Sequence, residues 1–116
     1  MLPIIYGISN CDTVRKARKW LADQGIEYQF VDVRDTPPTR ERIGDWIASA
    51  GKDVLVNKRS TTWKNMDNAE REEAENGDTL AVLLSHPTLI KRPVLEHNGA
   101  IDVGFNADNY GTRFNV

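Results

Sequence analysis

The sequence predicts an α/β fold with a mixed β-sheet and a helical insertion. Residues 2–33 have the pattern strand, helix, strand, and residues 94–114 have the pattern strand, strand, helix. Between them lie about 50 residues of mainly helical pattern. A strand–helix–strand unit makes its two strands parallel through a right-handed crossover, whereas a hairpin pairs its strands antiparallel. The sheet is therefore expected to contain both kinds of pairing.

Three consecutive patterns predict the N-terminal strand–helix–strand unit. Residues 2–8 form a continuous apolar run, which is typical of a buried strand. Residues 13–24 repeat apolar side chains at spacings of three and four, as an amphipathic helix does. Gly25 and Ile26 then match a left-handed helix cap with its hydrophobic contact. Residues 28–33 alternate apolar and polar side chains, which indicates a second strand.

Helices dominate the predicted insertion, at about residues 38–90. Residues 39–51 begin with a threonine cap and end at a glycine, which favours a helix. Residues 54–56 fit no single element. Residues 65–76 have a weakly apolar helical pattern, so we expect a surface helix and interpret its acidic side chains as plain solvent-exposed surface. Residues 79–86 predict a further helix that stops before a proline.

A β-hairpin and a short helix are predicted at the C-terminal end. Val94–Glu96 and Ala100–Val103 are short apolar runs, and Asn98-Gly99 between them is a strong hairpin signal. Asn106 can cap a last helix that reaches Phe114. The order of elements, with parallel strands first and a hairpin last, matches a thioredoxin-like plan with a helical insertion.

Composition limits the class of protein. A length of 116 residues suits one domain, so we expect residues 1–116 to form a single thioredoxin-like domain that contains the insertion. The net charge of −2 argues against non-specific nucleic-acid binding. No run approaches the roughly 20 apolar residues that cross a bilayer. The start, Met1–Ile4, lacks signal-peptide features, and one unpaired cysteine fits a reducing compartment, so we expect a cytoplasmic protein.

Cys11 is the main candidate for chemistry. It is the only cysteine, and it lies between the first predicted strand and the first predicted helix. Unpaired backbone N–H groups and the positive end of the helix dipole favour a thiolate there, and the thiolate is the nucleophilic form. Polar Asn10 and Asp12 flank it, which places it outside the apolar run. A free cysteine is often only a small buried hydrophobe, and the sequence leaves this alternative open.

Two further segments are candidates for the same site. A cis Pro93 would hold its strand beside the thiol with Arg92 aimed at the same pocket, although most such prolines are trans. Arg59 lies in a loop and could contact an oxyanion or a glutathione carboxylate with bidentate geometry. Asp12 is interpreted as a partner of the helix dipole rather than as a catalytic acid. One cysteine and two scattered histidines do not form a metal site.

Three stretches resemble the arsenate reductase (ArsC) family, in particular its YffB and Spx branch. They are residues 5–17 (IYGISNCDTVRKA), residues 86–94 (HPTLIKRPV) and residues 103–106 (VGFN). The loop of residues 57–62 is a looser match. The resemblance covers nearly the whole chain, and it implies a thioredoxin-like fold with a helical insertion.

The resemblance implies three activities that differ at two positions. YffB-type proteins have one cysteine and the same Gly104-Phe105 segment, and they look like glutathione-dependent thiol reductases. Arsenate reductases, which work with glutathione and glutaredoxin, surround the oxyanion with three arginines. Arg59 and Arg92 match two of these, but Gly104 occupies the third position, where arginine is expected to restore part of the site. Spx-type regulators bind RNA polymerase and carry a second cysteine where this chain has Val14.

We therefore expect a thiol–disulfide oxidoreductase with Cys11 as its catalytic residue. Glutathione is expected as a co-substrate, with no tightly bound cofactor and no metal. The expected partners are glutathione and a thiol or disulfide substrate, without nucleic acid or membrane, and the expected state is a monomer. The residues expected to contact substrate or glutathione are Asn10, Asp12, Thr13, Arg59, Arg92 and Pro93.

Overall fold

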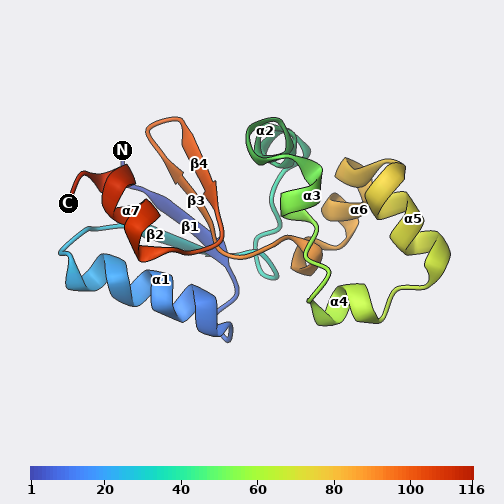
Figure 1. The fold of residues 1–116 in the computed structure, drawn as a ribbon, viewed down its shortest axis with the longest axis horizontal. Helices are drawn as coiled ribbons and strands as arrows, with labels where there is room; N and C mark the ends of the chain where they lie inside the picture. Colours follow the sequence, from blue (N-terminus) through green and yellow to red (C-terminus); the bar gives the residue numbers. More distant parts are fainter. The chain divides into compact units, whose positions relative to one another are not determined.

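The computed structural model describes residues 1–116 and contains one four-stranded mixed sheet (Figure 1). The strands are β1 (Ile4–Gly7), β2 (Gln29–Asp32), β3 (Val94–His97) and β4 (Ala100–Val103). Their order in the sheet is β2-β1-β3-β4. β1 pairs with β2 in parallel, while the pairs β1–β3 and β3–β4 are antiparallel. The predicted thioredoxin-like fold with a mixed sheet is confirmed.

The chain divides into two compact units, one of residues 1–32 with 92–116 and one of residues 33–91. The first unit holds the sheet and the helices α1 (Asp12–Asp23) and α7 (Ala107–Phe114). The second unit is helical, and the predicted insertion at about residues 38–90 lies within it. That the whole chain forms a single domain stays a prediction. None of the helices combines the length and the apolar character that crossing a bilayer requires.

The core of the first unit lies between the sheet and the two helices. Ile5 of β1 and Leu95 of β3 are paired across the sheet, and both are fully buried. Ala17 and Leu21 of α1 and Tyr110 of α7 pack against them. Both helices therefore cover the same face of the sheet (Figure 1).

The helix α1 has the features that its sequence predicts. Val14, Ala17 and Leu21 form one buried stripe along it. The helix is followed by Gly25 with φ of 70°, and the N–H of Ile26 donates to the Leu21 carbonyl at 2.9 Å. The predicted left-handed cap is confirmed, and it returns the chain to the sheet as β2.

The predicted hairpin and final helix are also confirmed. Asn98 and Gly99 have φ of 50° and 82°, as the two central residues of a tight hairpin turn require. The Asn106 side chain caps α7 by accepting from the backbone N–H groups of Asp108 and Asn109. The Asn98-Gly99 turn thus joins β3 to β4, and the Asn106 cap begins α7 three residues after β4 ends.

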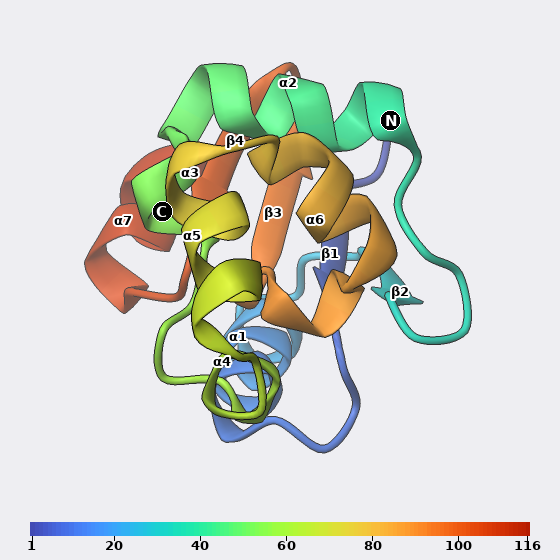
Figure 2. The ribbon, with the colours of Figure 1, turned by 90° about the vertical axis from the view of Figure 1, so that its right-hand side faces the viewer.

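Six short helical segments make up the second unit (Figure 2). They are α2 (Arg40–Ala50), α3 (Lys52–Leu55), α4 (Thr61–Lys64), α5 (Asn68–Asn76), α6 (Thr79–Ser85) and the 3-10 turn Pro87–Leu89. The helices α2 and α5 both pack on α6, with Ile43, Trp46 and Leu83 fully buried. The ambiguous residues 54–56 end α3 and supply Val56, which forms an isolated antiparallel bridge with Ile90.

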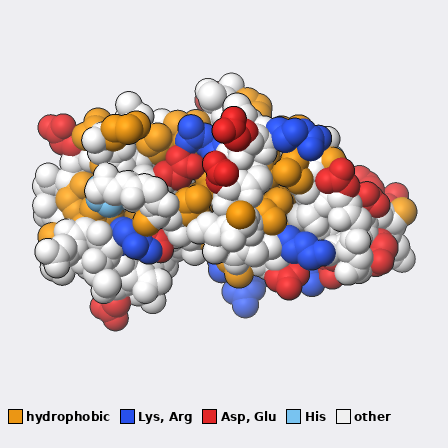
Figure 3. Space-filling model, turned by 90° about the horizontal axis from the view of Figure 1, so that it is seen from above, with side chains coloured by type: hydrophobic (Ala, Val, Ile, Leu, Met, Phe, Trp, Pro, Cys, Tyr) orange, Lys and Arg blue, Asp and Glu red, His pale blue; other side chains and the backbone are white.

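Acidic side chains gather at the end of the second unit that carries α5 (Figure 3). Most are exposed, as predicted, but their interpretation as plain surface is incomplete because several of these side chains cap helices. Asp67 and Glu70 form a capping box at the start of α5. Glu73 accepts from the N–H of Asp78, whose own carboxylate accepts from the N–H of Ala81 in α6. These carboxylates therefore satisfy backbone donors at two helix starts.

Candidate active site

Four strand ends meet at one end of the sheet. β1 and β2 are parallel with Gly7 opposite Asp32, so both strands leave the sheet side by side. β3 enters at this same end, because Val94 pairs with Tyr6 near the end of β1. β4 also leaves here, because its last residue, Val103, pairs with Val94. The topology thus brings the segments after β1, β2 and β4 and the segment before β3 to one place.

Cys11 lies at this end, as the N-cap residue of α1. Its backbone is extended (φ −106°, ψ 127°), and its carbonyl accepts the first helical hydrogen bond, from Arg15 N–H at 2.9 Å. The thiol is half-buried and makes no capping hydrogen bond. The N–H groups of the first helical turn have no partner within the helix, so a negative sulfur at this position is stabilised by them and by the helix dipole. Cys11 is not part of the core.

Two contacts hold the start of α1 against the sheet, and the sequence analysis missed both. A Cβ atom at Gly7 would lie 2.7 Å from Val14 Cγ2, so the glycine lets the first helical turn approach the strand. The backbone N–H of Ser9 donates to Asp32 Oδ2 at 3.3 Å. The sequence does contain a signal for the second contact, because Asp32 is a polar residue at the end of the predicted strand that runs parallel to β1.

The other predicted residues near Cys11 lie on the surface. Asp12 begins α1 and pairs with Arg15, and both side chains are more than half exposed. An acidic residue in the first turn is favourable beside the helix N-terminus, as predicted. Asn10 and Thr13 are exposed on either side of Cys11 and Asp12. Their contact with a substrate stays a prediction.

Arg92 and Pro93 lie at the same end of the sheet, immediately before β3. The bond between them is cis, as the functional interpretation of this dipeptide predicted. Pro93 is buried and Arg92 is half-buried. The Pro93 carbonyl accepts from the N–H of Gly104 at 2.8 Å, which joins the segments before β3 and after β4.

Gly104 has φ of +85°, so the third arginine of the arsenate reductases has no simple place in this chain. The left-handed conformation costs an L-residue with a side chain roughly 1–2 kcal/mol. The substitution Gly104→Arg would therefore strain the backbone, and its effect on an anion site stays a prediction.

Arg59 belongs to the second unit and has an exposed side chain. Its backbone N–H donates to Asn57 Oδ1 at 3.0 Å, and the adjacent Ser60 caps α4 by accepting from the N–H of Trp63. These bonds fix the loop locally. The predicted position of Arg59 beside Cys11 stays a prediction.

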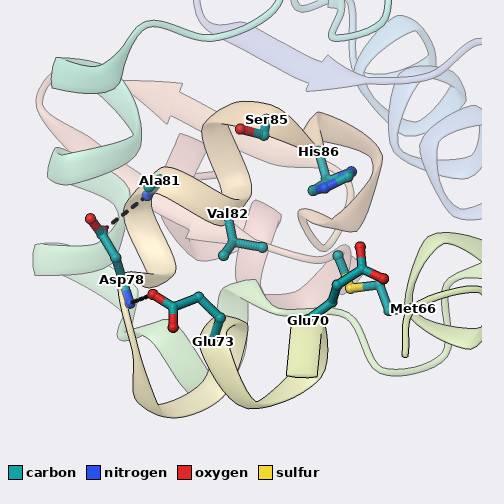
Figure 4. Close-up of a pocket in the computed structure, with 8 residues that line it drawn as sticks. All are labelled: Met66, Glu70, Glu73, Asp78, Ala81, Val82, Ser85 and His86. Carbon is teal, nitrogen blue, oxygen red and sulfur yellow. Dashed lines mark hydrogen bonds between the residues drawn. The ribbon is translucent and has the colours of Figure 1, made fainter. Parts of the chain in front are cut away.

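The second unit also holds a pocket of about 230 Å³, lined by residues of α5 and along α6 (Figure 4). Met66 and Val82 are among its apolar lining, and Glu70, Glu73 and Asp78 are its carboxylates. All three carboxylates accept backbone hydrogen bonds of the helix caps. The chain contains no group of three or more residues arranged to hold a metal ion. We therefore assign the pocket's acidic groups a structural role.

Comparison with known proteins identifies the family. Residues 6–113 match the sequence model of the ArsC family. The chain belongs to the ArsC family. This ArsC-family chain is 44% identical over 110 residues to an uncharacterized protein of Haemophilus influenzae, covering 95% of this chain and 96% of the other. It is 31% identical over 103 residues to the regulatory protein MgsR of Bacillus subtilis, covering 87% and 81% of the two chains.

A solved structure supports the same family. The chain is similar to a YffB protein with a TM-score of 0.88 and 35% sequence identity, and the match covers 95% of this chain and 96% of the other. The resemblance to the ArsC family and to its YffB branch is confirmed.

Proposed function

We propose that this ArsC-family protein is a thiol–disulfide oxidoreductase with Cys11 as nucleophile and glutathione as co-substrate. One observation carries the proposal: the only cysteine is half-exposed at the N-cap of α1 and lies at the sheet end where the cis Arg92–Pro93 bond precedes β3. A helix N-terminus is a setting in which thiolates are stabilised. Similarity to a YffB protein favours the single-cysteine class.

The proposed reaction has two displacements at sulfur. The Cys11 thiolate attacks the glutathione sulfur of a glutathionylated substrate, the substrate thiolate leaves, and a Cys11–glutathione disulfide forms. A second glutathione thiolate attacks the glutathione sulfur of that disulfide, which releases oxidised glutathione and regenerates the Cys11 thiolate. The leaving substrate thiolate takes up a proton. One free glutathione is consumed per turnover, because the other half of the oxidised glutathione comes from the substrate. No second cysteine of this chain is needed, in accord with its composition.

The neighbouring groups receive roles in this scheme. The N-terminus of α1 stabilises the thiolate before attack and when Cys11 is the leaving group. We assign Arg92 to a carboxylate of glutathione, since a guanidinium group binds a carboxylate with two parallel hydrogen bonds. Pro93 is assigned to shaping the groove that receives an extended ligand, which the cis bond supports. Asn10, Asp12 and Thr13 surround the thiol as binding residues.

The test uses a peptide whose cysteine carries glutathione in a mixed disulfide, with reduced glutathione as donor. Wild-type protein is expected to release oxidised glutathione catalytically, and Cys11→Ser is expected to be inactive. Arg92→Ala should raise KM for the peptide about tenfold, because a charge-assisted hydrogen bond contributes roughly 1.5–3 kcal/mol. Lys19→Ala is the matched control, since this cation lies two turns along α1 and pairs with Asp23. Activity of Cys11→Ser equal to wild type would refute the proposal.

A regulator is the second candidate, favoured by the 31% identity to a protein named as the regulatory protein MgsR. In this case the protein binds RNA polymerase without a redox switch, because Val14 stands at the position of the second cysteine. Immobilised protein would then retain RNA polymerase, and Cys11→Ser would retain it equally well. Binding of polymerase together with inactivity on the peptide would replace the enzymatic proposal.

We also propose that the protein acts as a monomer in the cytoplasm. The single unpaired cysteine supports the location, since it fits a reducing compartment. Sedimentation equilibrium is expected to give the mass of one chain, 13.1 kDa. A stable mass of two chains would contradict the proposed state.

A further inference from the structure

We propose that Asp32 is a positioning residue for Cys11, whose carboxylate fixes the turn that delivers the thiol to the N-cap of α1. The inference rests on the proposed function, because it concerns the same thiol. It adds a residue that neither the sequence pattern nor the family resemblance pointed to.

The geometry starts with the two parallel strands. Asp32 is the last residue of β2 and lies opposite Gly7, the last residue of β1. The chain then has only residues 8–11 in which to turn from the strand into α1. Within this turn the backbone N–H of Ser9 donates to Asp32 Oδ2 at 3.3 Å, a bond that spans 23 positions of the sequence. The hydrogen bond therefore connects the turn to the neighbouring strand β2 and not to another residue of the turn.

Asp32 is itself well anchored. Its strand pairs with β1 along four residues, and the next side chain, Val33, is 2% exposed. The Asp32 side chain is half-buried, whereas Ser9 is exposed. A hydrogen bond from an exposed turn to an anchored acceptor restricts the turn. It offsets part of the roughly 1–2 kcal/mol of conformational entropy that fixing one backbone residue costs. The bond thus reduces the freedom of the segment two residues before the nucleophile.

The Asp32 carboxylate carries a charge as well as a hydrogen-bond acceptor. A negative group beside the turn opposes the thiolate that the helix N-terminus favours. The other charged groups of the segments that meet here are Asp12 and Arg15, which pair with each other on α1, Arg34 and Asp35, which follow β2, and Arg92 before β3. A hydrogen-bond acceptor is useful here despite its charge, and this predicts that an uncharged acceptor serves at least as well.

The variants Asp32→Asn and Asp32→Ala separate the two properties. Both remove the charge, but only asparagine keeps an oxygen that can accept from Ser9. Glu27→Gln is the matched control, since it removes an exposed carboxylate of the same unit. Asp32→Ala is expected to lower kcat/KM for the glutathionylated peptide about tenfold, the effect of a lost hydrogen bond to a charged group. Asp32→Asn and Glu27→Gln should stay within about twofold, given that a neutral hydrogen bond contributes roughly 0.5–1.5 kcal/mol.

A further readout distinguishes positioning from general stability. Amide hydrogen exchange of the peptide that contains Ser9 should accelerate in Asp32→Ala and stay slow in Asp32→Asn. Equal exchange in wild type and Asp32→Ala, or equal activity of the two Asp32 variants, overturns the positioning role.

Failure of the proposed function gives a different result. In that case wild-type protein neither turns over the peptide nor forms a glutathione adduct at Cys11. The exchange measurement needs no activity, so it decides the role of Asp32 in the turn under either outcome.

Discussion

Gly7 is predicted to be the residue that sets the distance between β1 and the first turn of α1, and Gly7→Ala tests this. The added Cβ would lie 2.7 Å from Val14 Cγ2 and 3.1 Å from Cγ1. Val14 is fully buried, so it has little room to move. Overpacking of this kind typically costs 1–3 kcal/mol. Replacing glycine by alanine also stabilises the protein by about 0.4–1 kcal/mol, because it lowers the conformational entropy of the unfolded chain. We expect a net loss of about 1–2 kcal/mol of unfolding free energy.

A double-mutant cycle isolates the contact. Val14→Ala removes both clashing methyl groups and leaves Cβ of residue 14 at an ordinary 3.5 Å from the new Cβ. Alone it should cost about 2 kcal/mol, for two methyl groups and the space they leave. In the double variant the clash is absent, so its loss of stability should be about 1–2 kcal/mol smaller than the sum of the single losses.

The assay is urea unfolding followed by far-UV circular dichroism, with thermal unfolding in parallel. A loss of 1 kcal/mol lowers Tm by roughly 4 °C for a chain of this size. Gly44→Ala is the control, because its Cβ would lie 3.6 Å from Leu80 Cδ1 within a helix, an ordinary contact. It should stabilise by about 0.5–1 kcal/mol. Additivity of Gly7→Ala and Val14→Ala within about 0.5 kcal/mol would refute the reasoning.

Three other substitutions test the fold. The Tyr110 hydroxyl is buried without a hydrogen-bond partner. Burial, and after it the charge of Asp102, raise its pKa in the folded protein. The unfolded chain therefore loses this proton first, and the free energy of unfolding should fall as pH rises above about 10. Tyr110→Phe should remove this dependence and be neutral or stabilising in pH-dependent unfolding; a loss of more than about 1 kcal/mol would show a missed partner. Asp67→Ala should cost about 1 kcal/mol in urea unfolding by removing the α5 cap, and no loss would contradict the capping role. Arg113→Ala breaks a paired contact with Asp102 that is partly exposed, so the cost should be below about 1 kcal/mol and should vanish in high salt; a cost independent of salt would contradict an ionic contribution.

Local patterns predicted the elements of this fold well because local physics determines them. The Gly25 cap, the Asn98-Gly99 turn and the Asn106 cap each depend on neighbouring residues, and all three are present. Residues 54–56 fitted no single pattern, because α3 ends at Leu55 and Val56 is held by Ile90, a partner far along the chain. Long-range partners leave little trace in one sequence.

The candidate site shows the same division. The position of Cys11 at a helix start followed from the order of patterns alone. The contacts that hold it, Gly7 with Val14 and Ser9 with Asp32, depend on how strand ends meet. The positive φ of Gly104 was equally hidden, since a glycine is compatible with any backbone conformation.

The most direct test of the account is the rate at which iodoacetamide alkylates Cys11 at neutral pH, in the native protein and in the same protein unfolded by urea. Only the thiolate reacts, so the comparison reports what the fold does to the sulfur. We expect faster alkylation in the native state, located on Cys11 by mass spectrometry. Equal or slower alkylation in the native state would contradict it.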